Sequence, residues 1–324
     1  MKYLFFTFIV TIFVVTFGIS GCTSQSILPT PTPTTLPPTA LPPTTAPTVP
    51  EVKTDPVSST VEEMVALVNA GNFTEASEYF SDDAMIYFVG MPPTGMEIYR
   101  GKAQFRTFLE ECCTAQNFEW EIDIKRIKNG VVYVDAKTWM DFTRELGVAP
   151  NSFHEIFVVE DGKITLYYSH MTEITLANFK PVLLEAIPEL AEVMQPAFDP
   201  NEIPVNEINV TIANNTCSYE GPMTLKAGAV TVKVDVQDED ERFDKYAVVF
   251  ATLSEGKDLV DYMAAIYAAP PSWVNAVFFK ELNPGESQTY TGFNVSEGLG
   301  LLYMVCLAKY PDIIIGNAGP FDVR

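Results

Sequence analysis

Histidine is almost missing from this chain of 324 residues, which holds only His154 and His170. A metal site built on several imidazoles is therefore excluded by count. No Cys-x-x-Cys pair and no cysteine–histidine spacing suggests a zinc site. We therefore predict neither a metal nor another cofactor for this protein.

Positive charge is also scarce, since 20 lysines and arginines face 42 aspartates and glutamates, for a formal net charge of −22. A basic surface for nucleic acid is therefore not expected. Attraction to anionic lipid head groups is not expected either, for the same reason. The acidity is typical of a protein kept soluble at a cell surface.

The chain has one long apolar run, Tyr3 to Phe17, which small residues close at Gly18 to Gly21. The next motif, Ile19-Ser20-Gly21-Cys22, resembles the lipobox of exported prokaryotic lipoproteins. The resemblance implies a signal peptide over residues 1–21, cleavage before Cys22 and a lipid on that cysteine. The protein is then exported and bound to the outer face of a cell membrane. An ordinary secretory signal is the alternative; a transmembrane helix is disfavoured, because it needs about 20 apolar residues.

A tether of residues 22–56 follows. Between Pro29 and Pro50 it holds nine prolines and eight threonines. Such a segment cannot bury enough apolar surface to fold, and its prolines favour an extended polyproline II chain of about 3.1 Å per residue. Threonine beside proline also permits O-glycosylation. We predict a stalk that holds the folded part away from the membrane.

Four of the five cysteines remain once Cys22 carries a lipid. In an oxidising compartment pairing is expected. Cys112 and Cys113 are adjacent in a helical pattern, and neighbours of that kind rarely bridge. Cys217 and Cys306 lie in the same C-terminal domain and are the better candidate pair.

Residues 57–175 alternate helical and strand patterns and predict an α+β domain. Asn129-Gly130 is a strong turn signal between two strands, 118–127 and 131–142. A second hairpin is expected over 152–159 and 164–171. Helices are expected from Val61, over 73–80 and over 101–116, and a strand over 84–89. Together they predict a half-buried antiparallel sheet curved over helices.

This order resembles the SnoaL-like branch of the NTF2-like superfamily. The resemblance is carried by Leu67-Val68-Asn69-Ala70-Gly71-Asn72-Phe73, Phe80-Ser81-Asp82-Asp83-Ala84, Tyr99-Arg100-Gly101-Lys102 and Glu160-Asp161-Gly162-Lys163-Ile164. It implies a cone-shaped fold with a curved sheet around a pocket. Members include ketosteroid isomerases, dehydratases, hydrolases and many non-enzymatic binders.

The isomerase chemistry does not carry over with the resemblance. The general-base position falls at Phe88 and the oxyanion-hole tyrosine at Met64, and neither side chain can do that work. The third position, an acid on the penultimate strand, falls at or near His154, and the base of aldol-cyclising relatives falls near Ser169. The remaining pocket candidates bind an aromatic or amphiphilic ligand by stacking and hydrogen bonds. They are Tyr87, Tyr99, Trp139, His154, Tyr168 and His170.

Residues 176–205 are proline-rich and are expected to be a connector that starts with a short helical piece interrupted at Pro181. From residue 206 to residue 324 short strands with Pro and Gly turns predict a β-sandwich, with one helix near Asp258. Strands are expected over 208–213, 229–236, 245–253, 287–293, 301–307 and 321–323.

The end of this domain resembles the cupredoxin family in Pro284-Gly285-Glu286-Ser287, Tyr303-Met304-Val305-Cys306 and Phe321-Asp322-Val323. The copper chemistry does not carry over, because the two histidine positions fall near Tyr246 and at Asp312 and the methionine falls at Asn317. Only Cys306 is present of the thiolate, imidazole and thioether set. Without copper to bind, Cys306 is available to pair with Cys217.

These patterns predict a surface-anchored, non-catalytic lipoprotein that binds a small hydrophobic or aromatic ligand, or a partner, through the first domain. The alternative is an extracytoplasmic SnoaL-like lyase, isomerase or hydrolase that uses His154 or His170. The missing base and oxyanion donor favour the first.

Overall fold

The computed structural model describes residues 55–194, 199, 201–238, 242–254, 256–266, 271–309 and 311–324. The predicted signal peptide, Cys22 and nearly all of the predicted stalk lie outside these ranges. The two predicted domains belong to one compact unit, Lys53–Arg324. In the ranges described, none of the helices has the length and apolar character needed to cross a membrane.

The first domain is built on a six-stranded sheet of order β2-β1-β6-β5-β4-β3, in which only the β1–β6 pair is parallel. Its elements are α2 (Pro56–Asn69), α3 (Phe73–Ser77), β1 (Phe80–Met91), β2 (Gly95–Arg100), α4 (Gly101–Cys113), β3 (Glu119–Lys128), β4 (Val131–Trp139), α5 (Asp141–Glu145), β5 (Asn151–Glu160) and β6 (Lys163–Met171).

The predicted hairpin at Asn129-Gly130 is present, with both residues at positive φ. The sequence did not predict β2 or α5. Helix α5 has five residues, too few for a helical period to appear, and β2 lacks a strict alternation of apolar and polar residues. The strand predicted from Ala84 begins earlier, at Phe80, which the sequence had placed at the end of a helix.

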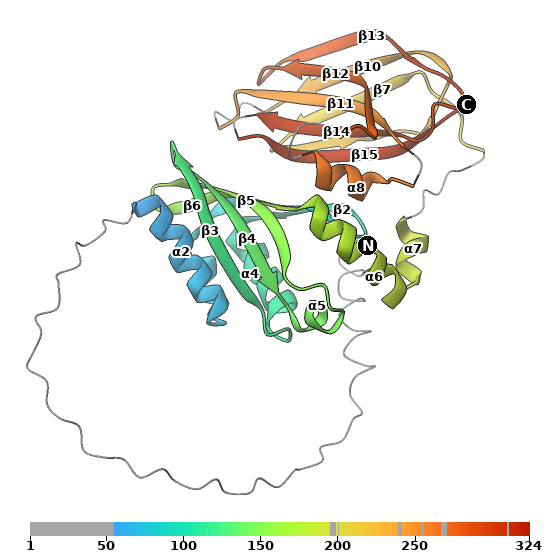
Figure 1. Ribbon diagram of the computed structural model, residues 1–324. Helices are drawn as coiled ribbons and strands as arrows, with labels where there is room; N and C mark the ends of the chain where they lie inside the picture. The colour runs from blue at the N-terminus through green and yellow to red at the C-terminus, as the bar shows by residue number, and fades with distance from the viewer. Residues whose placement is uncertain are drawn as a thin grey trace, which may run out of the picture. The chain divides into compact units, whose positions relative to one another are not determined.

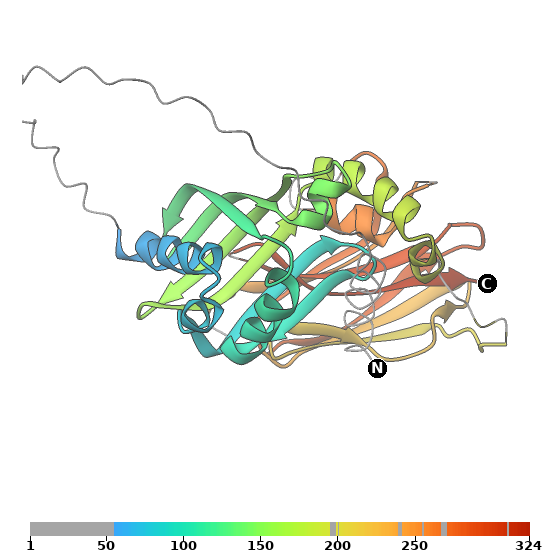
Figure 2. The same cartoon turned by 90° about the horizontal axis from the view of Figure 1, so that it is seen from below.

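Helices α2 and α4 cover one face of this sheet, as Figures 1 and 2 show. Asp55 caps α2 by accepting a hydrogen bond from the N–H of Val57 at 2.9 Å, and Pro56 stands at the first helical position. The apolar stripe Val61, Met64, Val65 and Val68 is buried, as its spacing predicts. We call the helix-covered side of the sheet the inner face.

The opposite side is the outer face, and alternation assigns each strand residue to one of the two. Tyr167 of β6 is on the inner face, because its ring centroid lies 6.0 Å from that of Phe105 in α4. Its neighbour Tyr168 is on the outer face. The same rule puts Glu155 inside and His154 outside, since Glu155 pairs with Ser169 and His154 with His170.

The segment after β6 is helical over α6 (Glu173–Ala186) and α7 (Glu189–Met194). Helix α6 begins earlier than predicted and runs through Pro181. Proline costs this helix one backbone hydrogen bond. Phe179 and Leu183, buried on either side of Pro181, supply the packing that offsets the loss.

The C-terminal region contains a four-stranded sheet of order β13-β10-β7-β8 and a five-stranded sheet of order β12-β11-β14-β15-β9. Its elements are β7 (Glu207–Ala213), β8 (Thr216–Tyr219), β9 (Thr224–Leu225), β10 (Gly228–Val236), β11 (Lys245–Leu253), α8 (Leu259–Ala265), β12 (Val274–Leu282), β13 (Ser287–Val295), β14 (Leu302–Lys309) and β15 (Ile313–Val323). The sequence missed β8, β9 and β12. That this region is cupredoxin-like stays a prediction.

A disulfide links the two sheets, since Cys217 of β8 is bonded to Cys306 of β14 with Cα atoms 6.1 Å apart. Gly316 permits the close approach, because a Cβ there would lie 2.3 Å from the carbonyl oxygen of Cys217. Cys112 and Cys113 are free thiols.

The C-terminal region packs on the outer face of the first sheet. The hydroxyl of Tyr87 donates to the carbonyl of Asn215 at 2.6 Å, and Lys180 of α6 pairs with the N-cap Asp258 and the first-turn Asp261 of α8, at 2.7 and 2.9 Å. The backbone of β1 approaches α8 closely, since a Cβ on Gly90 would lie 3.3 Å from the Cα of Ala264. The outer face is therefore partly closed by residues that come from much later in the chain.

Candidate functional site

The inner face contains one fully buried carboxyl group, that of Glu155, which is 1% exposed. Its Oε1 accepts hydrogen bonds from the hydroxyls of Tyr167 at 2.8 Å and Ser169 at 3.1 Å. Its Oε2 accepts one bond, from the indole N–H of Trp120 at 3.2 Å. Two strands, β3 and β6, thus place three donors around one carboxyl group of β5.

Burial raises the pKa of Glu155 to about 7, and the hydrogen bonds from Tyr167, Ser169 and Trp120 offset part of the rise. Desolvation dominates because the charged form loses its water, while no basic side chain compensates. Burial also raises the pKa of Tyr167 well above its usual value, so this hydroxyl keeps its proton and donates. Glu155 is therefore a carboxyl group able to gain or lose a proton near neutral pH.

Aromatic rings surround this group. The ring of Tyr167 stacks on that of Phe157 with centroids 4.6 Å apart, and Trp120 lies 5.7 Å from Tyr167. Phe88 lies 5.7 Å from Tyr167 and 4.6 Å from Phe108 of α4. These rings surround Glu155 with apolar, flat surfaces. Such surfaces suit aromatic or aliphatic ligands.

A second acid lies on the same face. Glu97 of β2 pairs with Phe88, which pairs with Ser169, which in turn pairs with Glu155, so all four occupy one row across the sheet. Burial raises the pKa of Glu97, and a hydrogen bond from the hydroxyl of Tyr99 at 2.7 Å acts against the rise. The row therefore contains two carboxyl groups, and neither forms an ion pair with any residue that the structure describes.

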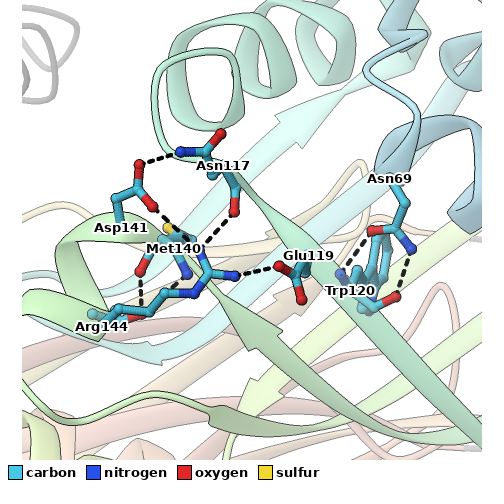
Figure 3. Close-up of polar contacts among 8 residues, drawn as sticks. Asn69, Asn117, Glu119, Trp120, Met140, Asp141 and Arg144 are labelled. Carbon is cyan, nitrogen blue, oxygen red and sulfur yellow. Dashed lines mark hydrogen bonds and ion pairs between the residues drawn. The ribbon is translucent and has the colours of Figure 1, made fainter. Parts of the chain in front are cut away.

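A surface hollow of about 420 Å³ lies where α2 and α4 end and β3 begins. Its lining includes Asn69, Phe73, Cys113, Asn117 and Glu119. As Figure 3 shows, Asn69 donates to the carbonyl of Trp120 at 2.8 Å and accepts from its N–H at 2.7 Å. Asn69 thus connects the lining of the hollow to the backbone of Trp120, whose side chain reaches Glu155.

Polar contacts hold the edge of this hollow in place. Arg144 of α5 pairs with Glu119 at 2.6 Å and donates to the carbonyl of Asn117 at 2.8 Å (Figure 3). Asn117 in turn donates to Asp141 at 2.6 Å. The charge of Glu119 is therefore balanced locally.

The structure does not bring the six predicted pocket residues together. Tyr99 is on the inner face, where it contacts Phe88 at 5.8 Å between ring centroids. The other five belong to the outer face, because each strand sends consecutive side chains to opposite sides. They are Tyr87, Trp139, His154, Tyr168 and His170.

The two histidines proposed as catalysts are separated from Glu155 by the sheet itself. His154 is exposed to 39% in its side chain and lies 2.9 Å from Asp135 through Nδ1. His170 is buried, and its Nε2 donates to the carbonyl of Met263 in α8 at 2.6 Å. Neither geometry directs an imidazole to the inner face.

Sequence reasoning missed Glu155 by one position. The acid of the penultimate strand was sought at or near His154, and the acid is the next residue. The alternation of side chains along the strand could have indicated Glu155. Phe153, Glu155 and Phe157 share one face of the strand, whereas His154 shares the other with Ile156. An acid between two phenylalanines on a strand is a candidate for burial with hydrogen-bond partners.

We predict that His170 makes the protein sensitive to acid. Burial lowers the pKa of His170 to about 4, while its hydrogen bond to Met263 acts in the opposite direction and the nearby His154 lowers it further. The fold therefore favours the neutral ring. The stability that the neutral ring provides is fully present above pH 6.5. As pH falls toward 4, the unfolded chain gains a proton at His170 that the folded chain does not, and the free energy of unfolding decreases by about 3 kcal/mol.

Urea unfolding of His170→Gln and of the parent at several pH values measures this difference. The difference in unfolding free energy between the parent and His170→Gln should decrease as pH falls from 6.5 to 4. The exposed His154→Gln should keep most of the parent's dependence on pH, because burial contributes more than His154 to the low pKa of His170. A difference that does not change with pH would contradict the prediction.

Residues 61–167 match the family model described as a SnoaL-like domain. The first domain is thus SnoaL-like and NTF2-like, as its sequence motifs imply. The comparison with curated proteins finds no match.

Solved structures similar to part of this chain include an NTF2-like protein of Cytophaga hutchinsonii, which is 15% identical, with a TM-score of 0.30, over 37% of this chain and 94% of that one. A putative ketosteroid isomerase of Kribbella flavida is 12% identical, with a TM-score of 0.30, over 36% and 82%. An LEH-like epoxide hydrolase of M. tuberculosis is 16% identical, with a TM-score of 0.30, over 41% and 96%. At these values the likeness transfers no activity to this chain.

Proposed function

We propose that the SnoaL-like domain binds a small, uncharged aromatic or aliphatic molecule that carries a hydrogen-bond donor, and that Glu155 recognises this donor. The observation that carries the proposal is the buried carboxyl group among aromatic rings. Oε2 accepts a single bond, from Trp120, and a carboxylate oxygen can accept two. A ligand hydroxyl therefore has an acceptor in apolar surroundings, where a hydrogen bond counts most.

Binding of hydroxylated and unsubstituted biphenyl tests this proposal. At pH 8 the parent should bind 4-hydroxybiphenyl about tenfold more tightly than biphenyl, since a hydrogen bond to a charged group is worth about 1.5–3 kcal/mol. The preference should weaken as pH falls through about 7, because Glu155 then gains its proton. Equilibrium dialysis measures both affinities.

Glu155→Gln should reduce this preference and remove its dependence on pH. Glu160→Gln is the matched control, because Glu160 ends the same strand and is exposed. Equal affinity of the parent for both compounds across the pH range would refute the proposal.

A second candidate, an acid–base enzyme, is favoured by one observation, the pKa of about 7 at Glu155. A general base works best when its pKa is near the working pH. In this second candidate function, Glu155 is the catalyst in place of His154 or His170. Exchange of the α-protons of 2-tetralone in D₂O, followed by NMR, distinguishes the two: an enzyme accelerates exchange in a Glu155-dependent way, and a binding protein leaves the buffer rate unchanged.

We further propose that the protein is a lipoprotein anchored outside the membrane through Cys22, with residues 22–56 as the stalk. The lipobox-like motif and the Pro/Thr composition support this arrangement. Residues 206–324 then form a cupredoxin-like sandwich that has lost its copper ligands. Its contacts with the outer face support a role in holding the first domain.

Cys22→Ala tests the anchor. We expect the variant to leave the membrane fraction or to retain its signal peptide, because no cysteine remains for the lipid. A single acyl chain holds a protein weakly, so two or three chains are expected on the parent. Cys112→Ala is the control and should stay in the detergent phase with the parent. Detergent partitioning of Cys22→Ala identical to that of the parent would contradict the anchor.

A further inference from the structure

Two polar atoms on the inner face are buried without a hydrogen-bond partner, the hydroxyl oxygen of Thr138 and the side-chain carbonyl oxygen of Asn151. Their residues are 7% and 4% exposed. They face each other across β4 and β5, since Thr138 pairs with Asn151. Burial of such a group without a partner costs about 1–3 kcal/mol, so two side by side call for an explanation.

The pair belongs to the same row as Trp120, which pairs with Thr138 from β3. Trp120 therefore stands beside Thr138 and Asn151 in the sheet, while its indole N–H points at Glu155. Asn151 and Glu155 are four residues apart on β5, in a stretch paired without interruption to β4, so their Cα atoms are about 13 Å apart. Phe153 lies between them on the same face.

The inner face thus has two acceptor sites with an apolar span between them. Glu155 offers the spare lone pair of Oε2 at one end, and Thr138 and Asn151 offer unused oxygens at the other. Trp120 lies along this span, since it pairs with Thr138 and its indole donates to Glu155, and its neighbour Glu119 and its partner Asn69 line the surface hollow. Asn69 holds that backbone by two hydrogen bonds, so a ligand that displaces the indole breaks its bond to Glu155 and leaves the backbone in place.

We propose that Thr138 and Asn151 form a second polar subsite, and that the ligand is an elongated, uncharged molecule with a hydroxyl group at each end. This inference rests on the proposed function, because it extends the site that begins at Glu155. One hydroxyl donates to Glu155, the other to Asn151, and the apolar middle takes the place of the Trp120 indole. The indole moves toward the hollow as the ligand enters.

Three compounds of the same shape test the subsite on the full exported chain. Biphenyl has no hydroxyl, 4-hydroxybiphenyl has one, and 4,4′-dihydroxybiphenyl has one at each end. The parent should bind the dihydroxy compound about tenfold more tightly than the monohydroxy compound, because the second hydroxyl finds its own partner.

Asn151→Leu and Thr138→Val remove the subsite. Each should bring the affinity for the dihydroxy compound down toward that for the monohydroxy compound, and neither should change the affinity for the monohydroxy compound. Thr138→Val has nearly the same shape and removes an oxygen without a partner, so its urea midpoint should not fall. This keeps the test valid if Asn151→Leu fails to fold.

The outcomes separate the two claims. If the parent prefers 4-hydroxybiphenyl to biphenyl but gains nothing from the second hydroxyl, the subsite is overturned and the proposed function stands. If the gain is present but unchanged in Thr138→Val and Asn151→Leu, the subsite is also overturned. If neither hydroxyl improves binding, the proposed function itself fails.

Discussion

Replacing both Cys217 and Cys306 by alanine is expected to lower the free energy of unfolding by about 4–5 kcal/mol. The bond joins residues 89 positions apart, and the chain-entropy model assigns a contribution of this size to a loop of that length. The two sheets of the C-terminal region would then lose the covalent link between them. Urea unfolding of the oxidised parent and the double variant measures the difference.

Two controls accompany this experiment. The parent treated with dithiothreitol should resemble the double variant. Cys112→Ser should behave like the oxidised parent, because Cys112 is a free thiol in the first domain. Peptide mapping without reduction should recover residues 217 and 306 in one linked fragment. Recovery of both as free thiols from exported protein would contradict the bridge.

Gly101→Ala is the second change with a large expected effect, a loss of about 3–5 kcal/mol of unfolding free energy. Gly101 starts α4 with a φ of +71°, and a Cβ there would lie 2.2 Å from the carbonyl oxygen of Asp82 in β1. A left-handed backbone costs an ordinary residue about 1–2 kcal/mol. The collision adds to this cost, because the atom in the way belongs to the backbone and either β1 or α4 must shift.

Gly147→Ala is the matched control. Gly147 has the same φ of +71° and no atom within 4 Å of the added Cβ. Its loss should therefore be limited to the backbone term of about 1–2 kcal/mol. Thermal or urea unfolding of the two variants measures the difference. Equal losses would show that the contact with Asp82 is of no consequence.

This result bears on the sequence motif Tyr99-Arg100-Gly101-Lys102, which was one basis for the SnoaL-like resemblance. The glycine is needed where β2 turns directly into α4 against β1. Arg100 donates to the carbonyl of Asn214 at 2.9 Å, so the same turn also contacts the C-terminal region. A four-residue motif therefore combines a backbone requirement with a contact that the sequence does not reveal.

Much of the first domain could be predicted from the sequence because its signals are local. The apolar stripe from Val61 to Val68 specifies a helix by its spacing, and Asn129-Gly130 specifies a hairpin by its backbone conformations. The scarcity of histidine ruled out an imidazole-rich metal site without any structure. The pairing of Cys217 with Cys306 followed from their shared region.

The candidate site depended on which face of each strand is covered, and tertiary structure alone decided this. Adjacent residues such as His154 and Glu155 point to opposite sides, so an error of one position changes the chemistry from an imidazole to a carboxyl group. Helix α2 contacts β5, the strand that carries Glu155, and α8, more than 80 positions after His170, covers that histidine. The sequence by itself determined the longer elements and their order. Contacts between distant segments determined which side chain is buried, because burial is a property of the whole packed chain and not of its local pattern.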